Sequence, residues 1–398
     1  MYRRCENFFS NQSKKYDIII SEPSNPWVSG VSSLFTEEFY SVIKNHINED
    51  GLFVQWIQVY ELDRVLLLSV LKALSSQFEH LKIYAPNHVD LVIIASNDSI
   101  IGLPDKSIFQ AETLRKELDL IGITNINDLY IRFLGDKKLY GSYFDSGKNV
   151  VNSDFYPILD HQSPRTRYMK MQADDLYNPP QYYLPVMQMY YPWLDHLEKN
   201  KVLHTRFMRN EHHMLKAQEI ARYMAGDLSQ INDKSVQFQA DLLLKASKEC
   251  SPRPDEALWV ESIFSIMTKS LPFLQAVENK LLFNLIKPNC PGKISQVQSY
   301  WLDLFLSLAT RNSSQVIQSG SILIDSDLSL SAPQERYIHT AVMLGLLVNE
   351  EYDIALDYWN NYKSVLLQNS ESLSITMTIL LAMVEANAAD VPLSLISK

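Results

Sequence analysis

Glycine is scarce in this chain. The 398 residues contain 11 glycines, and no two of them stand in a Gly-x-Gly arrangement. A Rossmann-type nucleotide site needs a tight glycine turn after its first strand and an acidic residue after its second. The sequence shows neither unit. We therefore expect no tightly bound nucleotide-like cofactor, and the pattern names no cofactor-binding residues.

Cysteine is rarer still, and the histidines are badly placed for a metal. Cys5, Cys250 and Cys290 are far apart and odd in number, which fits a reducing compartment, lacks any zinc motif and predicts a cytoplasmic protein. His212 and His213 are neighbours in a helical pattern and point about 100° apart, so they cannot bind one ion from one face. With His204 as the other candidate nearby, we predict no metal site.

Long apolar runs and a basic surplus are also missing. No run approaches the roughly 20 residues that cross a bilayer, so we expect neither a membrane span nor a signal peptide. The formal net charge of −10 argues against a nucleic-acid partner, because such proteins concentrate positive charge.

The most informative stretch follows a strand–loop–helix–strand pattern. The β-branched run Asp17–Ile20 predicts a buried parallel strand, and Pro23 with Pro26 ends it. Apolar residues at three- and four-residue spacing then predict a helix that is capped by Ser33 and extends to Ile47. The run Leu52–Val54 begins the next strand.

Polar side chains lie where a ligand would bind in such a sheet. In open α/β sheets, ligands bind beyond the carboxyl ends of the strands. Glu22, Ser24 and Asn25 occupy that position after the first strand. Trp27 and Trp56 are able to line an aliphatic ligand, and each fits a hydrophobic core equally well.

The remainder of the first part alternates helices with strands. A long amphipathic helix is expected first, followed by an antiparallel strand pair at one edge of the sheet, two helices and a loop-rich segment. In order, these elements are Glu61–Phe78, His80–Tyr84, Val89–Ala95, Ile108–Leu120, Ile126–Leu134 and Gly135–Pro164.

Four motifs in this part resemble one family. They are SEPSNPW at 21–27, SLFTEEFY at 33–40, GLFVQW at 51–56 and NSDFYPILD at 152–160. Together they resemble the spermidine synthase (polyamine aminopropyltransferase) family, with most likeness to its bacterial branch that is often fused to a membrane transporter-like domain. The resemblance covers roughly residues 16–167 and implies the C-terminal part of the catalytic domain, followed by a helical extension.

The resemblance implies a methyltransferase-like Rossmann sheet and aminopropyl transfer from decarboxylated S-adenosylmethionine, as co-substrate, to a di- or polyamine. By motif position Glu22 is the catalytic residue that holds or deprotonates the amine. Ser24, Asn25, Gln55 and Asp154 are the implied substrate-binding residues, although Asn25 stands where the soluble enzymes usually have a second aspartate. Asp160 is expected to pair with Arg165 or Arg167.

The chain departs from the family pattern at its beginning. The acidic residue that contacts adenine is missing near Arg4 and Cys5, so we expect the sheet to lack its N-terminal strands. Its exposed edge would then need a partner chain or the helical part to cover it.

The second part reads as helices alone. Residues 171–195 form a Pro/Tyr-rich connection between a partial Rossmann domain at 1–170 and a helical domain at 196–398. The predicted fold is thus α/β followed by an irregular all-α array. Tyr352–Trp359 resembles the second helix of a tetratricopeptide repeat, but no clean 34-residue period is present. The expected helices are His212–Gly226, Val236–Cys250, Asp255–Ser270, Phe273–Ile286, Ile294–Arg311, Ser313–Ile324, Gln334–Val348, Tyr352–Leu367 and Ser372–Ala386.

Three interpretations remain open. The chain is an aminopropyltransferase that needs a partner, such as a second copy, to supply the cofactor half. Alternatively, it is a pseudoenzyme whose remnant sheet supports a helical scaffold for protein partners. The third interpretation is a fragment of a longer reading frame. The first predicts polyamine binding, and the second predicts interactions through the helical domain.

Overall fold

The computed structural model describes twelve segments of the chain, which fall into two compact units. The described segments are 8–9, 11–28, 30–97, 100–146, 149–173, 184–196, 211–227, 231–249, 255–288, 294–326, 328–367 and 375–388. Residues 8–173 of these belong to an α/β unit, and residues 184–388 belong to a helical unit. The predicted α/β architecture followed by an all-α part is confirmed, whereas the exact domain boundaries stay a prediction.

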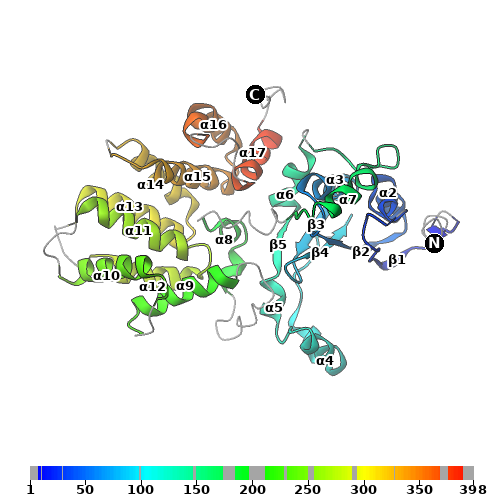
Figure 1. Cartoon of the computed structure of the whole chain (residues 1–398), viewed down its shortest axis with the longest axis horizontal. Coiled ribbons are helices and arrows are strands. Elements are labelled where there is room, and N and C mark those ends of the chain that lie inside the picture. The colour runs from blue at the N-terminus through cyan, green and yellow to red at the C-terminus, as the bar shows by residue number, and fades with distance from the viewer. Residues whose placement is uncertain are drawn as a thin grey trace. The chain divides into compact units, whose positions relative to one another are not determined.

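The α/β unit is built on a five-stranded mixed sheet with the order β1-β2-β4-β3-β5 (Figure 1). Its strands are β1 (Tyr16–Ser21), β2 (Ile47–Gln58), β3 (His80–Tyr84), β4 (Asp90–Ser96) and β5 (Phe133–Asp136). Its helices are η1 (Ser32–Phe35), α2 (Glu37–Asn45), α3 (Arg64–Gln77), η2 (Lys106–Gln110), α4 (Glu112–Leu120), α5 (Ile126–Tyr130), α6 (Lys137–Asp145) and α7 (Ile158–Tyr168).

The register fixes which strand ends meet. β1 runs parallel to β2, and Ser21 at the end of β1 pairs with Gln55. β2, β4 and β3 are then joined by antiparallel pairing. The carboxyl ends of the two parallel strands therefore lie at the same edge of the sheet, which places the loop after β1 beside the loop after β2.

One face of the sheet is packed and the other is only partly covered. Along β2, the side chains of Phe53 and Ile57 are buried, whereas those of the alternate residues Val54 and Trp56 are half-exposed. Helices α2, α3, α6 and α7 lie over the packed face (Figure 1). The Phe53 ring stacks on Phe78 with centroids 5.6 Å apart, and both rings are part of the buried core under this face.

The prediction that the first strand is buried is wrong. Within the described residues β1 is an edge strand, and Ile18 and Ile20 are 57% and 69% exposed. Burial of a parallel strand requires neighbours on both sides and both faces. Here β1 is paired with β2 alone among the described strands, so its outer edge and one face are open.

Three other sequence predictions in this unit need correction. The helix expected over Ile126–Leu134 ends at Tyr130, and residues 133 and 134 belong to strand β5 instead. Because β5 pairs with β3, the β3–β4 hairpin does not lie at the edge of the sheet as predicted. The segment expected to be loop-rich contains helix α6 (Lys137–Asp145). The first helix starts after Thr36, whose hydroxyl caps it by accepting from the Phe39 amide, and Ile47 already belongs to β2.

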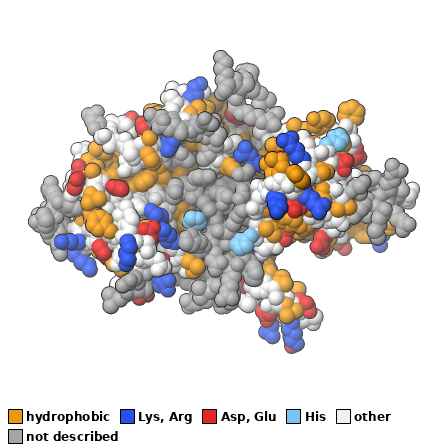
Figure 2. All heavy atoms as spheres, in the orientation of Figure 1, with side chains coloured by type: hydrophobic (Ala, Val, Ile, Leu, Met, Phe, Trp, Pro, Cys, Tyr) orange, Lys and Arg blue, Asp and Glu red, His pale blue; other side chains and the backbone are white. Residues whose placement is uncertain are grey.

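Helix α4 carries no core residue. None of its nine side chains is buried, and Lys116 pairs with Glu112 one turn away at 2.8 Å. Figure 2 shows acidic and basic side chains next to each other over this helix. A mixed-sign surface of this kind is typical of a solvated helix rather than of a ligand site.

The helical unit is a succession of helices that pack chiefly on their neighbours in the chain (Figure 1). They are α8 (Val186–Tyr190), η5 (Pro192–His196), α9 (Glu211–Met224), α10 (Lys234–Glu249), α11 (Glu256–Ser270), α12 (Ala276–Ile286), α13 (Gln296–Ala309), α14 (Ser313–Ile324), α15 (Ala332–Val348), α16 (Tyr352–Leu366) and α17 (Ile375–Asn387). The predicted helices from His212 onward agree with α9 to α17 within about three residues at each end. The tetratricopeptide likeness stays a prediction.

Close backbone approach joins α14 to α15. A Cβ atom built on Gly320 would lie 2.4 Å from the Val342 Cγ2 atom, and one built on Gly345 would lie 2.8 Å from the Ile317 Cγ1 atom. Each glycine therefore leaves room for a branched side chain of the facing helix. The absence of a side chain at these two places explains how the two helices pack so closely.

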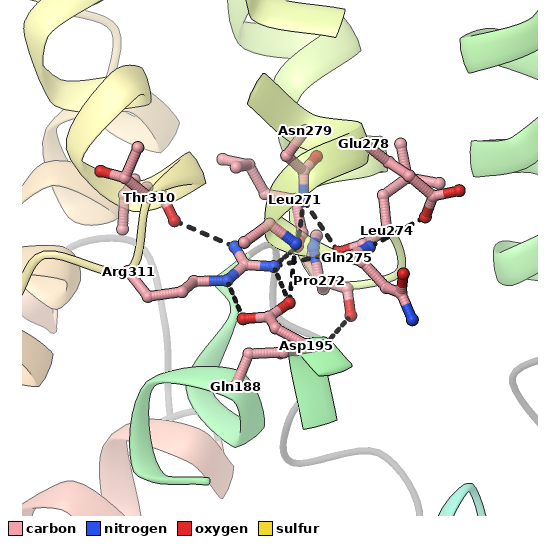
Figure 3. A network of polar contacts seen from close by, with 12 residues as sticks. Gln188, Asp195, Leu271, Pro272, Leu274, Gln275, Glu278, Asn279, Thr310 and Arg311 are labelled. Carbon is pink, nitrogen blue, oxygen red and sulfur yellow. Dashed lines mark hydrogen bonds and ion pairs between the residues drawn. The ribbon is translucent and has the colours of Figure 1, made fainter. Parts of the chain in front are cut away.

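A buried polar network holds the start of the helical unit against its middle (Figure 3). The Arg311 guanidinium donates to the Asp195 carboxylate, with Nε and Oδ2 3.1 Å apart. It also donates to the carbonyl oxygens of Leu271 and Leu274 at 3.3 and 3.0 Å. The Ala276 amide donates to Asp195 at 2.7 Å. The segment predicted as a connection thus contains η5, which packs inside the helical unit.

Candidate functional site

The loop that follows β1 presents polar groups at the strand ends. Pro23 and Pro26 are buried and anchor the loop, whereas Glu22 and Ser24 are exposed. The Asn25 carbonyl accepts a hydrogen bond from the Val28 amide at 3.0 Å, which turns the chain toward η1. Because two prolines prevent the strand from continuing, the residues between them are left at the edge where ligands of open sheets bind.

The loop that follows β2 meets this first loop. The side-chain amide of Asn25 donates to the Tyr60 hydroxyl at 3.3 Å, and the rings of Trp27 and Tyr60 meet edge to face with centroids 6.3 Å apart. Glu61 next to it has a positive φ of 56°, a left-handed conformation that few side chains adopt. Its carbonyl accepts from the Thr166 hydroxyl at 2.8 Å, so α7 holds the strained residue in place.

A cation from α7 lies against this cluster. The Arg167 guanidinium carbon is 5.1 Å from the centre of the Trp27 ring, and Nε is 3.7 Å from the Glu61 carboxylate. The two charged side chains are 57% and 32% exposed. We call Trp27, Tyr60 and Glu61 the strand-end cluster. It offers ring surface and a carboxylate to a positive charge, a combination that recognises ammonium and guanidinium groups.

The predicted substrate residues are placed differently from one another. Glu22 is exposed, and in the described part of the chain no ion pair involves it. Gln55 is fully buried, and its amide nitrogen donates to the backbone carbonyls of Ser21 and Trp56 at 3.3 and 2.8 Å. Its amide thus ties β1 to β2. Its expected contact with substrate stays a prediction.

Tyr40 packs against β2 on the buried face of the sheet. Its hydroxyl donates to the Gln55 side-chain oxygen at 3.5 Å, and its ring lies 5.8 Å from that of Phe53. Complete burial raises the pKa of the Tyr40 hydroxyl far above its ordinary value, so it stays protonated and serves as a hydrogen-bond donor.

Asn152 and Asp154 of the NSDFYPILD motif lie in different environments, and the predicted contact of Asp154 with substrate stays a prediction. Asp154 is exposed, and its amide donates to Glu38 at 2.8 Å. Buried Asn152 donates to the Phe35 carbonyl at 2.9 Å and accepts from the Leu159 amide at 3.1 Å, so it links η1 to the start of α7. Asp160 accepts from the Ser32 hydroxyl at 2.9 Å, in place of the expected arginine.

Sequence reasoning missed Tyr60, Glu61 and Arg167. A signal for the first two was present, because they directly follow the second parallel strand and should share its edge with Glu22. Arg167 gave no comparable signal, since its approach to Trp27 depends on where α7 ends in space. Gln58, the last residue of β2, is also fully buried, and neither of its amide atoms has a hydrogen-bond partner within the described residues.

The structure describes only some of the residues that were considered for metal binding. His213 stacks on Phe273 with ring centroids 5.6 Å apart. His204 and the three cysteines lie outside the described residues. Among the residues that are described, no three His, Cys, Asp or Glu side chains come together as metal ligands do. None of the described helices is both long and apolar enough to span a bilayer.

The parallel strand pair, the helix between its strands and the antiparallel hairpin define an α/β unit with a mixed sheet. Residues 1–95 match the model of the spermine/spermidine synthase domain. This match agrees with the resemblance that the motifs between residues 21 and 56 indicate.

Individual relatives carry the same family name. Polyamine aminopropyltransferases from strains Tuc7 and 5A of Buchnera aphidicola subsp. Acyrthosiphon pisum are each 35% identical over 81 residues, which is 20% of this chain and 28% of theirs. The polyamine aminopropyltransferase of Erwinia tasmaniensis is 46% identical over 48 residues, or 12% of this chain and 16% of its own. The chain thus spans less than a third of the length of the curated relatives that it matches.

Proposed function

We propose that the α/β unit binds a di- or polyamine at the carboxyl ends of β1 and β2 and takes part in aminopropyl transfer. The observation that carries this proposal is the meeting of the two strand-end loops at Trp27, Tyr60 and Glu61, within the segment that matches the spermine/spermidine synthase domain. Exposed Glu22 lies on the first of these loops.

Aminopropyl transfer to a polyamine requires carboxylate and aromatic groups of this kind. In aminopropyl transfer, a neutral amine nitrogen attacks a carbon bound to a sulfonium, the C–N bond forms, and the C–S bond breaks to release a thioether. A polyamine is cationic in water, so the protein must hold its ammonium groups and accept one proton. A carboxylate does both, and we assign the proton acceptor to Glu22. Aromatic rings suit the methylene chain and the remaining ammonium group.

We assign no contact with the adenosyl donor to the described residues. The glycine turn of the Rossmann fingerprint follows the first strand of that fold, whereas β1 resembles a later strand, so we do not assign the nucleotide to the loop that contains Pro23 and Pro26. The donor implied by the family is decarboxylated S-adenosylmethionine. We therefore assign its binding to residues outside the described part, and a second polypeptide or copy is one way to supply them.

Calorimetric titration of the full chain with spermidine and putrescine tests the amine site. Glu22→Gln removes one charge-assisted hydrogen bond worth about 1.5–3 kcal/mol, which corresponds to a loss of roughly 10- to 100-fold in affinity. Glu49→Gln is the matched control, because Glu49 is an exposed carboxylate of β2 distant in register from the strand end. Equal affinities of the wild type and Glu22→Gln would remove Glu22 from the site.

One observation favours a second function, a protein-interaction scaffold. On α12 the apolar side chains of Val277, Leu281 and Leu285 recur every four residues and are 59%, 57% and 36% exposed. An apolar stripe along one helix face is suited to pairing with a second copy. Sedimentation velocity should then show a dimer that Leu281→Lys converts to a monomer. A monomeric wild type at micromolar concentration would exclude this pairing.

A further inference from the structure

We propose that Arg167 is an internal cation that occupies the ammonium position of the strand-end cluster, and that an incoming amine must displace it. The inference rests on the proposed function, because it concerns the same site. It goes further in assigning to Arg167 the role of a competitor that sets the affinity for amines.

The contacts of Arg167 are those that an ammonium group would make. Its guanidinium carbon lies 5.1 Å from the centre of the Trp27 ring, within the range of a cation–π contact. Its Nε is 3.7 Å from the Glu61 carboxylate oxygen, within the range of an ion pair. A cation already bound by ring and carboxylate shows which charge this cluster accepts. A second cation cannot use both partners while the first remains.

The surrounding structure holds the backbone at Arg167 beside the strand-end cluster but leaves its side chain free to move. The Thr166 hydroxyl donates to the carbonyls of Glu61 and Ser163 at 2.8 and 3.0 Å, which fixes this turn of α7 beside the loop. The Arg167 side chain itself is 57% exposed, so it can turn toward solvent at little cost. A tethered cation competes at a high effective concentration, and this lowers the apparent affinity for free amines.

The chain provides a matched control on the same helix. Arg165 lies two residues away and is also exposed, but it makes no ring contact or ion pair in the described residues. Arg165→Ala and Arg167→Ala therefore remove the same charge from the same helix, whereas only the second frees the cluster. A difference in amine affinity between these two variants therefore reports occupancy of the cluster by Arg167, because the general electrostatic effect of losing one positive charge is the same in both.

The test is to titrate the wild type, Arg165→Ala and Arg167→Ala with spermidine and with propylammonium. Binding is measured by calorimetry and by Trp fluorescence. Circular dichroism checks that all three proteins are folded. We expect Arg167→Ala to bind spermidine about fivefold more tightly than Arg165→Ala does, in line with the loss of one exposed cation–π contact and ion pair. Equal affinities of the two variants would overturn the inference.

The two amines separate this inference from the function on which it rests. If spermidine binds the wild type in a Glu22-dependent manner but Arg167→Ala binds no more tightly, the inference alone fails. If Arg167→Ala gains affinity for propylammonium while no protein binds spermidine, the polyamine assignment fails and the inference stands. The absence of binding to all three proteins would contradict both.

Discussion

Two arginine–carboxylate pairs distinguish the two units of this chain. In the helical unit, the side chains of Arg311 and Asp195 are 6% and 8% exposed, and their closest atoms are 3.1 Å apart. In the α/β unit, Arg167 and Glu61 are 57% and 32% exposed and 3.7 Å apart. The same chemical pair is thus part of the core in one unit and part of an open surface in the other.

Burial decides what each pair can do. Desolvation lowers the pKa of Arg311, and the neighbouring Asp195 opposes this effect. Its Nη1 and Nη2 groups also donate to backbone carbonyls (Figure 3), so the group cannot leave without breaking these buried hydrogen bonds. Arg167 has no such constraint, because water can replace its contacts. A permanent structural contact and a displaceable one therefore differ in solvation rather than in residue type.

The largest expected effect comes from breaking the buried pair. Asp195→Asn leaves the Arg311 charge buried and without its counter-ion, which typically costs about 3–5 kcal/mol. Urea unfolding of the helical unit should show this loss in its midpoint. Glu61→Gln makes the equivalent change at the exposed pair and should cost less than about 1 kcal/mol. Similar losses in the two variants would contradict the comparison.

A smaller effect is expected from a buried histidine in the helical unit. His339 is 2% exposed, its Nδ1 is 2.7 Å from the Tyr358 hydroxyl, and the Tyr362 ring lies 4.6 Å away. Burial lowers the pKa of His339 to about 4. The unfolded chain, with a His pKa of about 6.5, binds the proton more readily, so stability is full above that pH and falls as the pH drops toward 4.

The measurement is urea unfolding at pH 6.5 and pH 4.5 for the wild type and His339→Gln. At about 1.36 kcal/mol per pH unit, the wild type should lose about 2 kcal/mol more than the variant between these conditions. Tyr358→Phe keeps the imidazole buried and should retain the pH dependence of the wild type. Parallel stability curves for the wild type and His339→Gln would show that His339 does not contribute.

The helical unit was easier to predict than the site. Its helix positions follow from apolar spacing, which the sequence displays directly, and the structure adds the caps Ser295 and Asn312. The strands β1, β3 and β4 and the loop at Glu22 were also predicted, whereas β5 was predicted as part of a helix. Burial of Ile18 was predicted wrongly, because the residues of a strand do not determine which other strands pair with it. Arg167 was missed for the same reason, because its partner Trp27 is 140 positions away in the chain.

The central claim is that the strand-end cluster receives an ammonium group. A crystal structure of the full chain soaked with spermidine tests this most directly. We expect electron density for an amine nitrogen between the Trp27 ring and the Glu61 carboxylate, with a methylene chain toward Glu22 and the Arg167 side chain turned to solvent. Spermidine bound elsewhere, with Arg167 still against Trp27, would contradict it.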